Sequence, residues 1–209
     1  DPARTIVITH HLPHQRSVAR RYKQHHTSGA YATRLPAELI QRCGLWVHGH
    51  SHDSVNHRFG DSLHETRVIS NPRGYRMLWQ AGAENPRFDP GFTVEFPWPK
   101  RAIPTILQKN MAIIQILSDL HIEFQPWQPV PTAADVVVLA GDIHCGGQTV
   151  GWVKQAFPDR PVVLVLGNHD YWNHTDINGA LDEARAETAG THIHLLENDA
   201  VTLAGIRFL

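Results

Sequence analysis

Several short polar motifs in this sequence follow runs of apolar residues, at points where a buried strand would end. The clearest is Gly167-Asn168-His169-Asp170, which comes directly after the apolar run 161–166. An amide, an imidazole and a carboxylate at the carboxyl end of a buried strand lie where open α/β sheets bind their ligands. We therefore expect chemistry at this position, provided that other strands bring matching groups to the same rim.

Four other apolar runs end in the same kinds of side chain. They end in His10 and His11, in His50 and His52, in Asp119 and His121, and in Asp142. A lone histidine at a strand end usually makes only loop hydrogen bonds, but five polar endings together are hard to explain in that way. Carboxylates, imidazoles and an amide oxygen suit divalent metals. Because this set of ligands needs no cysteine, a cysteine-rich structural zinc site is disfavoured. The set is large enough for two metal ions, with positions left for substrate and water.

The spacing of the candidates supports a crowded site. Asp119 and His121 are two residues apart, as are His50 and His52, so each pair falls on one side of an extended backbone. Glycine lets the backbone come close to a metal centre. It stands near or directly before three of the motif positions, at Gly49, Gly141 and Gly167.

Composition and length narrow the class of protein. The 209 residues suit one α/β domain, and a formal net charge of −1 gives no general reason to bind nucleic acid or an anionic membrane. Sixteen dispersed histidines are unusual, and imidazole is the commonest metal ligand. Two cysteines are too few for a disulfide framework, and no apolar run reaches the ~18 residues of a membrane span. Without a signal peptide, the expected location is the cytoplasm.

The expected secondary structure places each motif at the end of a strand. Strands are predicted over 4–9, 45–47, 92–96, 111–117, 135–140, 161–166, 192–196 and 200–209, with a hairpin over 55–68. Short helices are predicted over 35–43, with Leu39 and Ile40 facing inward, and over 178–189. The basic segment 15–31 has too little apolar periodicity for a core helix, and a solvated loop is its simplest interpretation.

Together the motifs resemble those of the calcineurin-like metallophosphoesterases. Asp-x-His, Gly-Asp, Gly-Asn-His-Asp, a strand-ending His and Gly-His-x-His all occur, and Asn71-Pro72-Arg73-Gly74-Tyr75 also resembles bacterial members. The resemblance implies a four-layer αββα sandwich and a hydrolase of phosphate mono- or diesters. It also implies two divalent or trivalent metal ions, drawn from manganese, iron, zinc, nickel and magnesium.

The resemblance further implies a role for each candidate residue. One ion would be held by Asp119, His121, Asp142 and His52, and the other by Asp142, Asn168, His10 and His50. His11 is the alternative to His10, because the sequence does not say which of the two points inward. His169 would face the substrate, where it stabilises the transferring phosphoryl group or protonates the leaving group, and Asp170 would orient its ring.

The order of the motifs departs from that of the family. Relatives begin with Asp-x-His and end with Gly-His-x-His, whereas here the last two motifs precede Met111. We expect one domain over 1–209, in which 1–110 resembles the family's C-terminal half and 111–209 its N-terminal half, as in a circular permutant. A helical insertion carried by relatives is missing from its expected place. A recorded order that differs from the covalent chain, or a fused gene fragment, would also explain the arrangement, and a homodimer with exchanged halves could complete the site.

The expected substrate is a small phosphate ester. Residues 144–147 read His-Cys-Gly-Gly where protein phosphatases carry Asp-Arg-Gly, which disfavours a phosphoprotein. A metallo-β-lactamase-type zinc hydrolase is also disfavoured, because it would leave Asp119 and His121 unexplained. The remaining alternative is a non-catalytic metal-binding scaffold of the same fold, or an inactive fragment.

Overall fold

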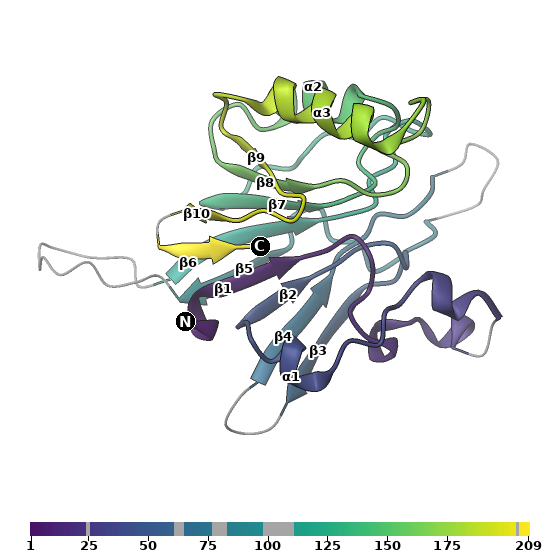
Figure 1. Cartoon of the computed structure of the whole chain (residues 1–209), viewed down its shortest axis with the longest axis vertical. Coiled ribbons are helices and arrows are strands. Elements are labelled where there is room, and N and C mark those ends of the chain that lie inside the picture. Colours follow the sequence, from purple (N-terminus) through teal and green to yellow (C-terminus); the bar gives the residue numbers. More distant parts are fainter. Residues whose placement is uncertain (24–25, 61–64, 77–82, 98–110, 204) are drawn as a thin grey trace, which may run out of the picture.

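Two β-sheets packed face to face make up most of the structure (Figure 1). The structure is a computed structural model, and it describes residues 1–23, 26–60, 65–76, 83–97, 111–203 and 205–209. One sheet has six strands in the order β10-β11-β1-β2-β4-β3, and the other has five in the order β5-β6-β7-β8-β9.

The six-stranded sheet combines strands from both ends of the chain. Its strands are β1 (Thr5–Ile8), β2 (Leu45–Val47), β3 (Val55–Gly60), β4 (Glu65–Ser70), β10 (Val201–Leu203) and β11 (Ile206–Phe208). The four central strands are parallel, and β3 and β10 pair antiparallel at the two edges. Between β1 and β11, the Ile8 N–H donates to the Leu209 carbonyl at 2.8 Å, so the last residue of the chain lies beside the end of β1.

The five-stranded sheet is built from the second half of the chain and one earlier strand. Its strands are β5 (Thr93–Pro97), β6 (Met111–Leu117), β7 (Val136–Ala140), β8 (Val162–Val165) and β9 (Ile193–Leu195). Strands β6 to β9 are parallel, and α2 (Gln148–Ala156) and α3 (Ile177–Thr188) connect the later ones. Strands β7 and β8 are buried throughout, as continuous runs of Val and Leu require in a sheet covered on both faces.

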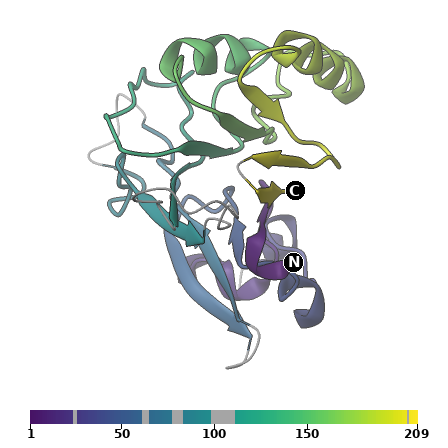
Figure 2. The same cartoon turned by 90° about the vertical axis from the view of Figure 1, so that its left-hand side faces the viewer.

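Helices on the outer faces complete a four-layer αββα sandwich. The layer between the sheets includes Ile6, Val47, Ile114, Ile116, Val138, Val163 and Phe208. Helices α2 and α3 cover the other face of the five-stranded sheet, as Figure 2 shows in the turned view. The short helix α1 (Ala37–Ile40) packs through Ile40 against Trp46 and Phe59 on the outside of the six-stranded sheet. The fold class predicted from the sequence is therefore confirmed.

Most predicted elements are present with small changes at their ends. The helix predicted over 35–43 is a single turn, and Leu39 is 43% exposed instead of facing inward, whereas Ile40 is fully buried. The sequence pattern did not indicate α2, because Gly147 precedes it and Gly151 interrupts its short apolar face. The segment 15–31 contains 3₁₀ turns at Gln15–Ser17, Arg20–Tyr22 and His26–Ala30. Residues 98–110, predicted as part of an extended tail, lie outside the described residues.

No helix in the described part of the chain is long and apolar enough to span a membrane.

Ile114 tests the layer between the sheets, because it is fully buried there. Ile114→Ala should lower the free energy of unfolding by about 2–5 kcal/mol, since buried methylene groups are lost and a cavity remains. Urea unfolding followed by circular dichroism measures the change. Ile177→Ala is the matched control, because Ile177 is 65% exposed, and its effect should stay within about 0.5 kcal/mol. Equal losses for the two variants would contradict the placement of the core.

Candidate metal centre

The polar strand endings from both sheets meet at one rim of the sandwich. Strands β1 and β2 of the six-stranded sheet lead to the histidines, and β6, β7 and β8 of the five-stranded sheet lead to the acidic motifs. Three groups of three side chains form there among the described residues, with ligand atoms within 4.8 Å of one another in each group. The first group is His10, His50 and Asp142, and the second is His52, Asp119 and His121. A third group shares His121 and adds Glu123 and His169, of which Glu123 was not predicted as a ligand.

A short backbone seam joins the two sheets at this rim. The segment that follows β4 runs beside the residues that follow β6, with a parallel bridge between Pro72 and Ser118. The Ser118 N–H donates to the Asn71 carbonyl at 3.3 Å, and the Gly74 N–H donates to the Asp119 carbonyl at 3.0 Å. The seam therefore fixes Asp119 relative to the six-stranded sheet that carries the histidines.

The first group is centred on the Asp142 carboxylate. His10 Nδ1 donates to the Ala140 carbonyl at 2.9 Å, so Nε2 faces Asp142 Oδ2 at 3.3 Å and His50 Nδ1 at 3.2 Å. His11 turns away instead, with Nε2 2.8 Å from the Ala30 carbonyl. The structure thus places His10, and not its neighbour, beside Asp142.

The second group lies beside the first. His52 Nε2 is 3.0 Å from His121 Nε2 and 3.6 Å from Asp119 Oδ1. Asp142 Oδ2 is also 3.9 Å from His121 Nε2, so this oxygen lies between the two groups. Among the described residues, Asp142 is therefore the carboxylate that lies within 4 Å of an imidazole nitrogen of each group.

Asn168 reaches the same cleft from the end of β8. It is exposed, and it lines a pocket of ≈ 250 Å³ that the two groups share. The lining residues are Tyr22, Tyr31, His50, Ser51, His52, Tyr75, Glu84, Asp142 and Asn168. Every metal-ligand candidate from the sequence therefore lies in one of the two groups or on the wall of this pocket.

The side chains at the rim fit a bound cation. Two pairs of imidazole nitrogens face each other, at 3.0 and 3.2 Å, and such a pair can share only one proton. Asp119 Oδ2 is fully buried and has no hydrogen-bond partner within the described structure. A buried carboxylate oxygen without a partner is costly, and converging lone pairs of nitrogen and oxygen are what divalent metals bind.

The electrostatics of the first group follow from the proximity of His10 and Asp142. Burial alone would lower the pKa of His10, but the hydrogen bond with Asp142 and its charge raise that pKa to about 10. Burial, followed by the charge of His10, lowers the pKa of His50 to about 4. Burial alone would raise the pKa of Asp142, but His10 holds it well below its usual range. These pKa shifts favour an ionised Asp142, a protonated His10 and a neutral His50 at pH 7.

The backbone of the candidate ligands is unusual. Five of them have positive φ: 69° at His50, 46° at His52, 48° at Asp119, 46° at His121 and 54° at Asp142. The left-handed region costs an L-residue roughly 1–2 kcal/mol, although Asp and His tolerate it better than most. Strained conformations of this kind persist only where the surrounding structure fixes them.

Close packing at the rim depends on glycine. A Cβ at Gly49 would lie 2.7 Å from both Asp119 Oδ2 and the Ala140 carbonyl. A Cβ at Gly167 would overlap Asp142 Oδ1 and the Asp142 N–H. The close approach expected at these glycines is therefore present.

His169 lies behind the pocket, held on both ring nitrogens. Its Nδ1 donates to Glu123 Oε1 at 2.9 Å, and its Nε2 is 3.0 Å from the Tyr75 hydroxyl. The ring stacks on Trp172 with centroids 3.6 Å apart, and the His169 N–H donates to Asp142 Oδ1 at 2.8 Å. Tyr75 lines the pocket directly. His169 is therefore connected to the pocket by its hydrogen bond with the Tyr75 hydroxyl.

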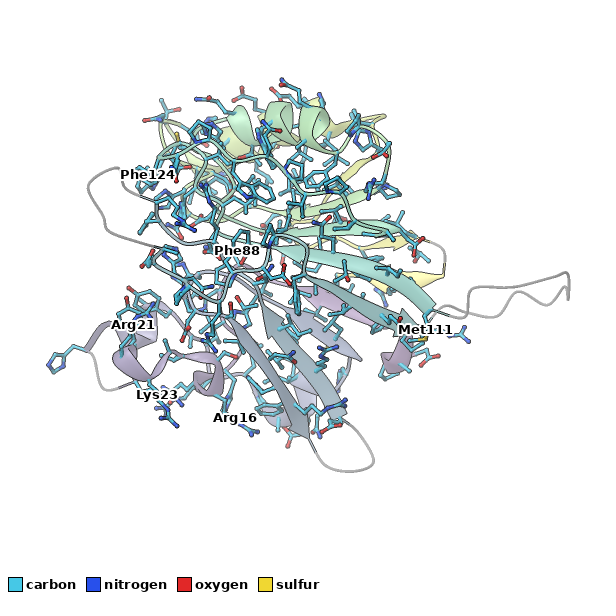
Figure 3. All side chains as sticks on the ribbon, turned by 180° about the vertical axis from the view of Figure 1, so that it is seen from behind. Arg16, Arg21, Lys23, Phe88, Met111 and Phe124 are labelled. Carbon is cyan, nitrogen blue, oxygen red and sulfur yellow. The ribbon has the colours of Figure 1, made fainter. Side chains whose placement is uncertain are left out.

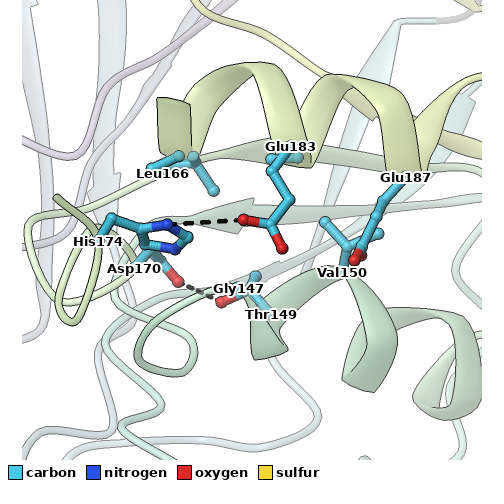
Figure 4. Close-up of a pocket in the computed structure, with 10 residues that line it drawn as sticks. Gly147, Thr149, Val150, Leu166, Asp170, His174, Glu183 and Glu187 are labelled. Atoms are coloured by element: carbon cyan, nitrogen blue, oxygen red, sulfur yellow. Dashed lines mark hydrogen bonds and ion pairs between the residues drawn. The ribbon is translucent and has the colours of Figure 1, made fainter. Parts of the chain in front are cut away.

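Asp170 does not orient the ring of His169, and that prediction is wrong. Its carboxylate turns back into its own loop and accepts the N–H groups of Asp142 at 2.8 Å and Gly167 at 2.7 Å. It also accepts the Thr149 hydroxyl at the start of α2, which Figure 4 shows. Burial raises the pKa of Asp170 to about 6, against the effect of the Thr149 hydrogen bond. Asp170 instead ties together the loops after β7 and β8.

Glu123, Glu84 and Tyr75 were missed by the sequence reasoning about the site. Glu123 accepts from both His169 and His121, and these hydrogen bonds lower its pKa to about 2 even though burial opposes them. Its signal was available, because it continues the alternation that begins with the Asp-x-His motif. Glu84 Oε2 accepts a hydrogen bond from His52 Nδ1, in the second group, at 2.8 Å. No sequence pattern around Glu84 indicated this contact. Burial, followed by nearby carboxylates, raises the pKa of Tyr75 to about 12, so its hydroxyl stays protonated.

Residues 111–200 match the family model of the calcineurin-like phosphoesterases. The match includes the Asp-x-His, Gly-Asp and Gly-Asn-His-Asp motifs, and it confirms the resemblance expected from the sequence. The match suggests metal-dependent hydrolysis of phosphate esters. His10, His50 and His52 lie outside the matched segment. No curated protein and no solved structure shows significant similarity to the chain.

Gly167 offers a test of the crowded rim that leaves every candidate ligand in place. Gly167→Ala should weaken manganese binding at least about tenfold, because the methyl group displaces the Asp142 carboxylate, and lost outer contacts cost metal sites about 10- to 100-fold. Isothermal titration with manganese measures the change. Gly151→Ala in α2 is the control, since a Cβ there meets nothing within 4 Å. Unchanged binding in Gly167→Ala would contradict the close packing.

Proposed function

We propose that this protein is a metal-dependent hydrolase of phosphate mono- or diesters. The observation that carries the proposal is the pair of His-His-Asp groups that open into one pocket, with Asp142 Oδ2 between them. The family of residues 111–200 supports the same reaction class. Monoesters and diesters are both consistent with the site.

We assign the ligands of two metal ions on the basis of these groups. One ion would bind His52, Asp119, His121 and Asp142, and the other would bind His10, His50, Asp142 and Asn168. Divalent ions bound in this way lower the pKa of a coordinated water and neutralise charge on a phosphoryl group. Glu84 would hold His52 by accepting its Nδ1 proton, and the Ala140 carbonyl would hold His10 in the same way.

His169 and Tyr75 would handle the proton of the leaving group. The bond from Nδ1 to Glu123 fixes the ring of His169 and leaves Nε2 for exchange with the Tyr75 hydroxyl. When both ring nitrogens carry a proton, the Nε2 proton of His169 can move to the Tyr75 oxygen while the Tyr75 proton passes to the departing oxygen of the ester, which leaves a neutral His169 still bonded to Glu123 through Nδ1. This order requires the two side chains to act together.

The size of the pocket supports a small substrate. About 250 Å³ accommodates a phosphate ester with a modest organic group. Each group of candidate ligands is complete within one chain, so we propose that the active unit needs no exchange of halves between protomers. We also propose that residues 1–110 act as the second half of the same domain despite the permuted order.

Two alanine variants should separate metal binding from proton transfer. Asp142→Ala should abolish turnover and lose bound metal, because it removes the carboxylate that faces both groups. His169→Ala should also abolish turnover, but with metal content retained. Metal analysis of each purified variant, beside turnover of p-nitrophenyl phosphate, gives both readouts. Turnover of His169→Ala at the wild-type rate would contradict the role assigned to His169 in proton transfer.

Tyr75→Phe tests whether the hydroxyl links His169 to the substrate. The change removes one oxygen and keeps the ring that packs against His52 and His121. Turnover should fall by about 10²- to 10⁴-fold, the usual contribution of general acid–base catalysis, with KM and metal content little changed. Tyr171→Phe, outside the pocket lining, is the matched control. A normal kcat in Tyr75→Phe would contradict proton transfer through the Tyr75 hydroxyl.

Turnover of paired esters tests the function as a whole. We expect hydrolysis of p-nitrophenyl phosphate or of its bis ester in the presence of manganese, and loss of that activity after chelation. The ratio of the two rates distinguishes monoesterase from diesterase activity. No turnover with manganese, iron, zinc, nickel or magnesium would favour a non-catalytic metal-binding scaffold of the same fold.

A further inference from the structure

A second, cationic pocket is formed by the same segment of chain that supplies Tyr22 to the metal pocket. It has a volume of ≈ 310 Å³ and is lined by His14, Gln15, Arg16, Val18, Lys23 and Ser28. None of these six residues is acidic. Figure 3 shows Arg16 and Lys23 along one side of the molecule, together with Arg21. The pocket therefore presents positive charge without a carboxylate in its wall.

The walls of this pocket are held by packing against β3. The Arg16 guanidinium lies 5.3 Å above the centre of the buried Phe59 ring, and the His14 ring meets the same ring edge-on at 5.0 Å. The Arg16 N–H donates to His14 Nδ1 at 3.1 Å. Contact with an aromatic face limits the freedom of an arginine, so Arg16 is in place before any ligand arrives.

The positive charge of this pocket is uncompensated. Arg16 and Lys23 have no carboxylate within ion-pair distance among the described residues, whereas Arg58, Arg87 and Arg160 each pair with an acid. Burial, followed by the charges of Arg16 and Arg34, lowers the pKa of His14. Of these causes, only the charges of Arg16 and Arg34 favour an anion at the same place, since burial disfavours either charge.

The cationic pocket and the metal pocket share one short segment of chain. Tyr22 lines the metal pocket, while its neighbour Lys23 lines the cationic pocket. The Ser28 hydroxyl, on the wall of the cationic pocket, donates to the Tyr22 carbonyl. A molecule with two separated anionic groups could therefore place one at the metals and the other beside Arg16.

We propose that the cationic pocket binds a phosphate group. Building on the proposed function, the ligand is either a second phosphate of the ester that occupies the metal pocket or free inorganic phosphate. Arg16 would supply a fixed planar donor and Lys23 a mobile charge, which together match the tetrahedral oxygens of phosphate. The substrates favoured by this arrangement are esters that carry more than one phosphate.

Direct binding tests the pocket without relying on catalysis. Inorganic phosphate is titrated calorimetrically into the intact chain, with and without manganese. Arg16→Gln/Lys23→Gln should bind one phosphate fewer than the wild type in both conditions. Lys154→Gln/Arg185→Gln removes the same charge from α2 and α3 and should bind as the wild type does. Circular dichroism confirms that each variant is folded. Equal numbers of bound phosphates in the first variant and the wild type would overturn the proposal.

Kinetics distinguish the two sources of phosphate. The specificity constants are compared for the p-nitrophenyl phosphodiester of thymidine and for the same compound carrying a 3′-phosphate. If the second phosphate of a substrate is bound, Arg16→Gln/Lys23→Gln should reduce the preference for the second compound by at least about fivefold, the effect of losing one or two exposed charge contacts, and Arg16→Lys should restore much of it. An unchanged preference with phosphate binding lost would assign the pocket to free phosphate. Phosphate binding without any turnover would reject the proposed function alone.

Discussion

The seam between the segment after β4 and the segment after β6 is the contact on which the site depends. It joins the two sheets through directional backbone hydrogen bonds, in addition to side-chain packing and to the hydrogen bonds that His10 Nδ1 and the His50 N–H make with the other sheet. Because of it, carboxylates from one sheet are buried against imidazoles from the other. Buried carboxylates without partners cost several kcal/mol each. The two sheets must therefore meet in this register for either set of polar groups to be tolerated.

The rim was predictable because its signals are local. Each strand that supplies it is a strong apolar run followed at once by polar residues, and the end of such a run is fixed by burial alone. Which carboxylate forms a hydrogen bond with the His169 ring was not predictable in the same way. Asp170 is adjacent to His169 in sequence, but the chain turns between them and its carboxylate meets backbone amides instead. Glu123 fills that place from another loop, and only the folded chain shows this.

The arrangement also explains why connectivity matters little to the chemistry. The family match covers residues 111–200, while three of the four candidate metal-ligand histidines come from the first 60 residues. The groups still converge, because parallel strands deliver their carboxyl ends to one rim whichever strand comes first along the chain. Helix α2 was missed for a related reason: its two buried valines become a packing face only when the sheet lies beneath them.

The left-handed backbone at five candidate ligands has a consequence for ion selection. Residues in sparsely populated conformations stay there because their neighbours prevent other choices, so these side chains cannot relax freely toward an incoming ion. The fold, and not the bound ion, then sets the size of the metal site. Discrimination among metals should then follow ionic radius and preferred geometry more than the general order of affinity, in the way that rigid sites separate magnesium from calcium.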